Sequence, residues 1–163
     1  MRKIDKIIFH CSATVEGQNI SVETIRDWHV NGRGWSDIGY HYYIGIDGKI
    51  QSGRPVSRIG AHTKGENESS IGVCYCGGLN SKKKAKDTRT EAQKIAIIKL
   101  IKTLKNIYPN ASLHGHNEFA NKACPCFDVQ EEYKELQPKG FKRKSKTDKS
   151  GGAYKKSGKD TGT

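Results

Sequence analysis

The sequence has no long hydrophobic run and no secretion signal at its start. No apolar stretch approaches the roughly 20 residues that a membrane-spanning helix requires. Asp5 and Lys6 interrupt the apolar residues near the N-terminus, and no small-residue cleavage site follows them. We therefore expect a protein that is made in the cytoplasm without a signal peptide and that leaves it, if at all, by another route.

Cysteine is scarce, with five residues at positions 11, 74, 76, 124 and 126. A disulfide framework is not predicted, because the number is odd and a reducing compartment is expected when no export signal is present. The thiols are then either metal ligands or small side chains packed in a core. Packing is the favoured interpretation for Cys74, which lies in an apolar run.

Aliphatic residues are almost missing from the C-terminal end. Residues 139–163 contain nine Lys or Arg against two Asp, and they are rich in Gly, Ser and Thr. Such a segment buries too little apolar surface to offset the entropy cost of ordering. We expect residues 1–138 to form one domain and residues 139–163 to be a disordered Lys/Gly/Ser-rich tail, which carries more than half of the formal charge of +12.

The first 138 residues alternate between strand and helix patterns. Strands are expected over five stretches: 3–10, 40–46, 49–51, 70–76 and 112–115. Helices are expected over three stretches: 22–30, 90–108 and 128–136. Ser21, Thr90 and Asp128 are suitable N-caps for these helices, and Asp47-Gly48 predicts a two-residue hairpin turn. This order predicts the α/β class, with one central mixed sheet.

The densest group of metal-binding residue types lies between positions 116 and 128. His116 precedes Cys124 by eight residues, so a loop can return both side chains to one ion, and His10 at the end of the first strand is a third candidate. Zinc accepts imidazole nitrogen and thiolate sulfur, and a catalytic zinc usually keeps its fourth position for water. On spacing alone His114 competes with His116, because the two residues alternate along a strand and share a face.

Several segments, in order along the chain, carry a family resemblance. Residues 7–14 (IIFHCSAT), 34–42 (GWSDIGYHY) and 116–128 (HNEFANKACPCFD) resemble the type 2, zinc-dependent N-acetylmuramoyl-L-alanine amidases, above all the small phage amidase endolysins. Residues 60–65 and 67–78 resemble the same family, so the likeness extends from about residue 4 to residue 136. Peptidoglycan recognition proteins share the fold of this family.

The resemblance implies a central mixed β-sheet flanked by helices, with a zinc-containing groove on one face. It implies Zn²⁺ as the cofactor, held by His10, His116 and Cys124. The catalytic tyrosine and lysine of the family fall on Tyr40 and Lys122. Zinc supplies a nucleophile from water and polarises the carbonyl, and donors such as an ammonium and a phenol stabilise the negative charge that develops.

Four further polar residues lie near these motifs. His62, in a Gly-rich segment between strands, is expected on the groove wall as a substrate-binding residue. His41 follows Tyr40 on a strand, so it is expected to point to the opposite face as a packed histidine. If His116 is the ligand, His114 is expected either to hydrogen-bond a metal ligand or to pack as a histidine of the sheet. Glu118 is interpreted as a surface residue or a partner of a ligand, because no His-Glu-x-x-His pattern places it as a base.

The activity implied by the resemblance is hydrolysis of the amide bond between N-acetylmuramic acid and L-alanine of the peptidoglycan stem peptide, after release of the enzyme to the cell wall. The alternative is a non-catalytic peptidoglycan-binding module, as in relatives that lack a zinc ligand, and the presence of Cys124 favours the enzyme. A small enzyme of this kind can act as a monomer. Anionic envelope polymers, a membrane surface and nucleic acid all stay open as partners of the basic tail, because lysine clusters bind polyanions generally.

Overall fold

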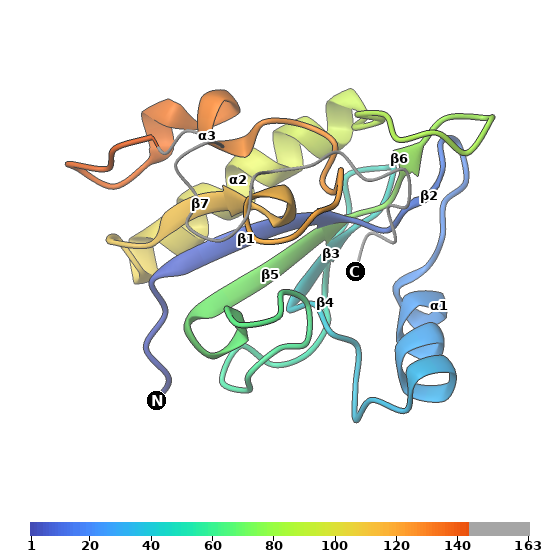
Figure 1. Ribbon diagram of the computed structural model, residues 1–163, viewed down its shortest axis with the longest axis horizontal. Helices are drawn as coiled ribbons and strands as arrows, with labels where there is room; N and C mark the ends of the chain where they lie inside the picture. Colours follow the sequence, from blue (N-terminus) through green and yellow to red (C-terminus); the bar gives the residue numbers. More distant parts are fainter. Residues whose placement is uncertain (144–163) are drawn as a thin grey trace.

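The computed structural model describes residues 1–143 (Figure 1). Residues 144–163 lie outside the described part, and so does most of the predicted tail. Five strands build the central sheet: β1 (Lys6–Cys11), β3 (Tyr42–Ile44), β4 (Ile50–Ser52), β5 (Ser70–Tyr75) and β7 (Ser112–Gly115). A separate parallel pair consists of β2 (Thr14–Val15) and β6 (Gly78–Leu79).

The order of strands across the central sheet is β4-β3-β5-β1-β7. β1 lies between β5 and β7 and is parallel to both, and β3 is parallel to β5. Only β4, at one edge, runs antiparallel to its neighbour. The sheet is therefore mixed, and the predicted fold class of a single α/β domain is confirmed.

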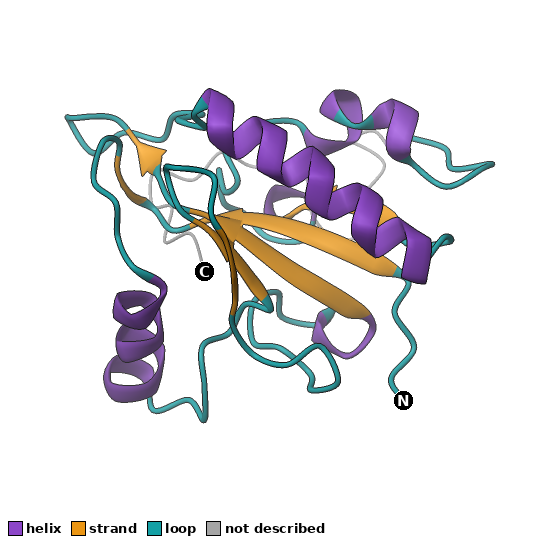
Figure 2. Ribbon diagram, turned by 180° about the vertical axis from the view of Figure 1, so that it is seen from behind, coloured by secondary structure: helices purple, strands orange, loops and turns teal. Residues whose placement is uncertain are grey.

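One face of the sheet is covered by the long helix α2 (Glu91–Ile107), which crosses the strands in Figure 2. The helix begins at a capping box, as predicted: the Thr90 hydroxyl accepts from the Gln93 backbone N–H, and the Gln93 side chain accepts from the Thr90 N–H. Its buried side chains share one apolar cluster with Ile7 and Phe9 of β1. This cluster is the main core of the protein.

The other face of the sheet packs against α1 (Val22–Asp27), which begins at the predicted N-cap Ser21. A π-helical turn, η1 (Trp28–Gly32), continues the helix, so helical structure spans the predicted range. The buried side chains of α1 form a second apolar cluster with Tyr43 and Cys74 of the sheet. Cys74 is thus a packing residue, as predicted.

The turn between β3 and β4 differs from the prediction. The Gly48 N–H donates to the Gly45 carbonyl at 2.9 Å, and the Gly45 N–H donates to the Lys49 carbonyl at 3.1 Å. Three residues therefore form the loop, and Gly48 adopts the left-handed region with φ of 84°. The prediction of a two-residue turn at Asp47-Gly48 is therefore wrong. Gly48 is instead the left-handed residue that ends a three-residue loop.

The last predicted helix is split into two short pieces. α3 (Val129–Glu132) begins at the predicted N-cap Asp128, and the 3-10 turn η4 (Lys134–Leu136) follows it. Tyr133 separates them with φ of −114° and ψ of 28°. Its buried ring lies 5.8 Å from that of Phe9, and its hydroxyl accepts from Arg89 at 2.9 Å. Packing of one aromatic side chain therefore prevails over the local helical pattern.

Two further 3-10 turns flank the strands that surround the site. η2 (Asn67–Ser69) precedes β5, and η3 (His116–Glu118) follows β7. Beyond residue 138 the described chain continues in contact with the domain: the Phe141 ring lies 5.9 Å from that of His114, and Arg143 pairs with Asp128. Within residues 1–143, no helix combines the length and the apolar character needed to cross a membrane.

Candidate active site

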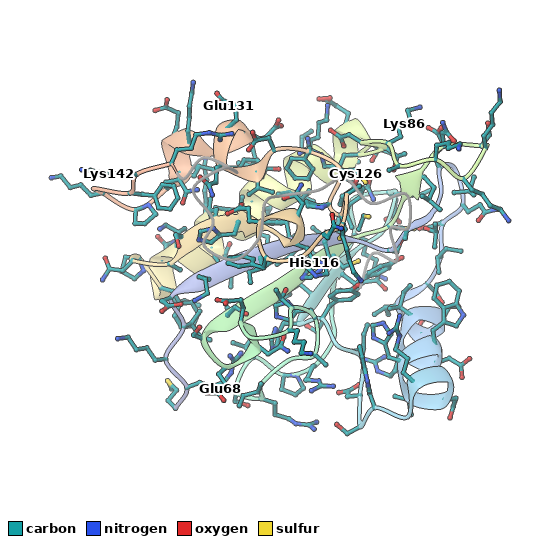
Figure 3. All side chains as sticks on the ribbon, in the orientation of Figure 1. Glu68, Lys86, His116, Cys126, Glu131 and Lys142 are labelled. Carbon is teal, nitrogen blue, oxygen red and sulfur yellow. The ribbon has the colours of Figure 1, made fainter. Side chains whose placement is uncertain are left out.

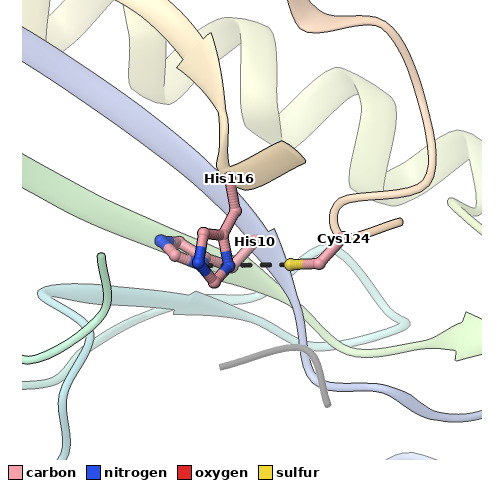
Figure 4. A group of neighbouring side chains, drawn as sticks. All are labelled: His10, His116 and Cys124. Carbon is pink, nitrogen blue, oxygen red and sulfur yellow. Dashed lines mark hydrogen bonds between the residues drawn. The ribbon is translucent and has the colours of Figure 1, made fainter. Parts of the chain in front are cut away.

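Three potential metal ligands meet at the carboxyl ends of neighbouring strands. His10 is the penultimate residue of β1, His116 directly follows the adjacent β7, and Cys124 lies in the loop after η3. Their ligand atoms lie within 4.8 Å of one another, and all three residues are buried (Figure 4). Figure 3 shows the place of His116 within the whole molecule. Parallel pairing of β1 with β7 thus brings together residues that are more than 100 positions apart.

Both imidazoles of this cluster are held in the neutral form. The ring centroids of His10 and His116 are 4.6 Å apart. Burial, together with the neighbouring His116, lowers the pKa of His10 well below its ordinary value. Burial and the positive charge of Lys122 lower the pKa of His116 to about 4. Each ring therefore has a lone pair available for a metal ion at neutral pH.

The three residues fit a zinc ion. His116 Nδ1 is buried and has no hydrogen-bond partner among the described residues, whereas buried polar atoms normally have one. Cys124 Sγ accepts from the Cys11 backbone N–H at 3.2 Å, a contact that favours the thiolate. Two neutral imidazoles and one thiolate are a donor set that zinc binds well, and three protein ligands are typical of a catalytic site.

The turn that carries His116 is held in place by Glu118. One carboxylate oxygen accepts from the Gly115 N–H at 2.7 Å, and the other lies 2.8 Å from His114 Nδ1. The second nitrogen of His114, Nε2, lies 2.6 Å from the Ser112 hydroxyl. Both nitrogens of His114 therefore contact other side chains. His114 is a histidine of the sheet that contacts Glu118, and it does not compete with His116 for a metal ion.

Tyr40 lies beside the cluster. Its ring centroid is 5.1 Å from that of His10. Burial raises the pKa of Tyr40 well above its usual value, and the neighbouring Cys74 thiol raises it further. The phenol therefore stays protonated across the physiological pH range and can donate a hydrogen bond.

Lys122 is a half-buried residue, two positions before Cys124. Its positive charge contributes to the lowered pKa of both His10 and His116. The ammonium is therefore within electrostatic reach of the cluster, because such an effect falls off with distance. A cation at this position can stabilise negative charge that develops on a substrate carbonyl.

His62 and His41, the two other histidines expected near the site, are both buried close to His10 or to each other. His62 is only 4% exposed, and its Nδ1 lies 2.9 Å from His10 Nε2. The ring thus contacts a candidate metal ligand. His41 is buried, and its Nδ1 accepts from the Gly72 N–H at 3.0 Å while its Nε2 lies 2.9 Å from the Arg58 carbonyl oxygen. His41 therefore ties β5 to a neighbouring loop, in agreement with its expected packing role.

Three residues near the cluster were not identified as functional from the sequence. The Thr63 hydroxyl lies 3.3 Å from His10 Nε2, and the Ser70 hydroxyl lies 3.3 Å from His62 Nε2. The ring of His29 lies 5.5 Å from that of Tyr40. Serine and threonine are too common to attract attention, and the one available signal was that Thr63 directly follows His62.

Known proteins resemble this chain in sequence over most of its length. The family model described as N-acetylmuramoyl-L-alanine amidase matches residues 1–127. The endolysin of Escherichia phage T7 is 45% identical over 126 residues, which cover 77% of this chain and 83% of the relative. The endolysin of Enterobacteria phage T3 is 43% identical over the same length and coverage.

Solved structures give the same result. The N-acetylmuramoyl-L-alanine amidase LysC from Clostridium intestinale superposes with a TM-score of 0.68 at 29% identity, over 83% of each chain. A complex of the peptidoglycan recognition proteins LCa and LCx with tracheal cytotoxin superposes with a TM-score of 0.69 at 26% identity, again over 83% of each chain. The chain therefore belongs to the N-acetylmuramoyl-L-alanine amidase family and is an enzyme of that family.

Proposed function

We propose that this amidase depends on zinc and hydrolyses the bond between the lactyl group of N-acetylmuramic acid and L-alanine of the stem peptide. The observation that carries the proposal is the convergence of His10, His116 and Cys124, two neutral imidazoles and a thiol, within 4.8 Å of one another. The match of the family model to residues 1–127 supports the peptidoglycan substrate. The phage relatives named endolysin support action on the bacterial cell wall.

His10, His116 and Cys124 would hold the zinc ion. When bound, zinc supplies activation of water at neutral pH and polarisation of the scissile carbonyl. The low pKa values of the two histidines keep both imidazoles neutral above about pH 5, each with one nitrogen lone pair, since the pKa of His116 is about 4 and that of His10 is also well below its ordinary value. Glu118 keeps the His116 turn in place through the Gly115 N–H.

Lys122 and Tyr40 are the proposed catalytic residues. The Lys122 ammonium would stabilise the negative charge on the carbonyl oxygen during attack. The Tyr40 phenol remains protonated, so it acts as a hydrogen-bond donor to the reacting group and not as a phenolate base. Removing one such donor typically lowers the rate about 100- to 1,000-fold.

The sequence alone left one alternative, a peptidoglycan-binding module without activity, which the family match disfavours. The presence of all three ligand side chains in one cluster favours the enzyme, since a module that only binds needs no metal. Digestion of purified muropeptides, with products identified by mass spectrometry, tests the two functions directly. We expect release of intact stem peptide, loss of the activity with a chelator, and recovery with zinc.

Two lysine variants sharpen this experiment. Lys122→Met is expected to keep its zinc content and to lower the rate about 100-fold or more. Lys64→Met is the matched control, because Lys64 is an exposed lysine in another loop, and its rate is expected to equal that of the wild type. Cleavage between sugars, or amidase activity that is indifferent to the chelator, would overturn the proposal.

A further inference from the structure

We infer that His62 is a positioning residue that fixes the proton of His10 on Nε2, so that His10 presents the lone pair of Nδ1 to the metal ion. The inference rests on the proposed zinc site and adds a second layer of residues beneath it. It gives His62 a role through a metal ligand and not through contact with the substrate.

A backbone carbonyl sets the direction of the hydrogen bonds beneath His10. The Ser70 hydroxyl oxygen lies 2.7 Å from the Glu66 carbonyl oxygen, which can only accept, so the hydroxyl donates to it. The Ser70 oxygen also lies 3.3 Å from His62 Nε2. Because the hydroxyl proton is already used, Ser70 accepts here, and His62 Nε2 carries the ring proton.

The same argument assigns the position of the proton on His10. A neutral imidazole has one N–H, so His62 Nδ1 has a lone pair. His10 Nε2 lies 2.9 Å away and must carry a proton, because two lone pairs at this distance repel. The Thr63 hydroxyl oxygen, 3.3 Å from His10 Nε2, offers a second acceptor for that proton. His10 Nδ1 is then the deprotonated nitrogen, and it is the atom that lies 3.9 Å from Cys124 Sγ.

Two glycines leave the space that the His62 ring occupies. A Cβ atom at Gly72 of β5 would lie 2.5 Å from His62 Cδ2, and a Cβ atom at Gly60 would lie 2.8 Å from the same atom. Both distances are too short for a real contact, so any larger residue at either position would displace the ring. The fold thus reserves a closely fitted place for this side chain directly under His10.

Loss of the acceptor at position 62 is expected to weaken zinc binding. Without a partner for its Nε2 proton, His10 also populates the form with the proton on Nδ1, which cannot bind a metal ion through that atom. Outer partners of metal-bound histidines typically contribute 10- to 100-fold to metal affinity. The Thr63 hydroxyl compensates in part, so the effect is expected toward the lower end of that range.

A pair of variants with similar size separates the acceptor from simple packing. Asparagine and leucine have the same branching, but only asparagine presents an acceptor oxygen near the position of His62 Nδ1. We expect the zinc dissociation constant of His62→Leu, measured by competition with a chromogenic chelator, to rise about tenfold or more. We expect His62→Asn to recover most of that loss. Equal affinities in the two variants, either both normal or both weakened, would overturn the inference.

Two serine variants provide a matched control. Ser70→Ala removes the group that orients His62, and a measurable weakening of zinc binding, smaller than that of His62→Leu, is expected. Ser69→Ala removes the neighbouring hydroxyl, which accepts from Lys6 Nζ at 2.9 Å and contacts no histidine in the described hydrogen bonds, so unchanged affinity is expected. An equal effect of the two serine variants would contradict the inference.

Nitrogen NMR of the zinc-free wild-type protein tests the inference without any variant. The ¹⁵N shifts and couplings of His10 are expected to show the proton on Nε2, and a proton on Nδ1 would overturn the inference even if His62→Leu fails to fold. The zinc titration of the wild type separates this from the proposed function. A wild type that binds no zinc contradicts the zinc-dependent mechanism, whereas a wild type that binds zinc with His10 protonated on Nδ1 contradicts only the role of His62.

Discussion

Both faces of the central sheet bury apolar side chains, but the face opposite α2 also carries the buried histidines of the site. On β1, Ile7 and Phe9 lie in the apolar cluster shared with α2, whereas His10 points to the other face and joins the ligand cluster. On β5, Val73 belongs to the α2 cluster, whereas Gly72 on the other face makes room for the His62 ring. The alternation of a β-strand thus places the main core under α2 and the histidine His10 on opposite faces of the sheet.

The difference between the faces lies in what each buried group requires. The α2 face gains stability from removal of apolar surface from water, which needs shape but no specific partner. The site face buries several histidines, and each ring nitrogen needs a hydrogen-bond partner or a metal ion. We therefore expect substitutions on the α2 face to change stability, and substitutions on the site face to change metal binding.

The largest expected effect is that of Cys124→Ser in the ligand cluster. A hydroxyl is a poor zinc ligand, so zinc binding should weaken by more than the roughly 100-fold that loss of an outer partner costs, and the amidase activity should fall below detection. Zinc content by mass spectrometry and stem-peptide release measure the two effects.

Cys76→Ser is the control for this substitution. Cys76 is also buried, but its thiol already donates to the Gln18 carbonyl at 3.2 Å, a bond that a serine hydroxyl can retain. Zinc content and activity should stay near those of the wild type. A Cys124→Ser protein with full zinc content would show that the ligand set is different.

The next effect, on stability and not on zinc binding, is expected for Ile101→Ala on the α2 face. Ile101 is fully buried in the main core, so the substitution should lower the free energy of unfolding by about 2–5 kcal/mol. Ile98→Ala, on the exposed side of the same helix, should change it little. Urea denaturation measures both. Zinc affinity of the folded Ile101→Ala protein should remain normal, and a parallel loss of zinc affinity would show that the two faces are coupled.

The smallest effect per residue is the pH dependence of the zinc-free protein. Burial lowers the pKa of His29, His41 and His116 to about 4 each, from an ordinary value of 6.5. Between pH 6.5 and 4 the unfolded chain binds protons that the folded protein does not, so stability falls as the pH falls. From pH 7 to pH 6 the loss should be ~0.7 kcal/mol for each histidine.

Urea denaturation at pH 8, 7 and 6 measures this dependence. Stability should be nearly constant from pH 8 to pH 7, where the histidines are neutral in both states, and should decline below pH 7. The carboxylates with a lowered pKa, Asp37 and Asp87, act only below about pH 4 and do not interfere. A flat profile between pH 7 and pH 6 would show that the buried histidines do not resist protonation.

Much of the fold follows from local sequence signals. The capping box at Thr90 and the N-cap at Ser21 mark two helix starts that the structure confirms. The strand ends at His10 and at Gly115 were close to their predicted positions, because apolar runs bounded by polar residues define strands well. The break at Tyr133 was not predictable, because it depends on packing against Phe9, which is distant in sequence.

The site also has features that the sequence predicts and features that only the structure reveals. The spacing from His116 to Cys124 indicated a metal loop, but only the parallel pairing of β1 with β7 brings His10 to it. The layer beneath His10 could not be predicted, because the hydroxyls of Thr63 and Ser70 gain their significance from distances across the fold. His62 was identified as a site residue, yet its contact with His10 could be read only from the structure.

The most direct test of the central claim is zinc K-edge X-ray absorption of the reconstituted protein. Ligation by His10, His116 and Cys124 predicts one sulfur at about 2.3 Å and two imidazole nitrogens at about 2.0–2.1 Å, with the remaining scatterer a light atom. The sulfur contribution should disappear in Cys124→Ser. A spectrum without sulfur, or one with two or more sulfur ligands, would contradict the account.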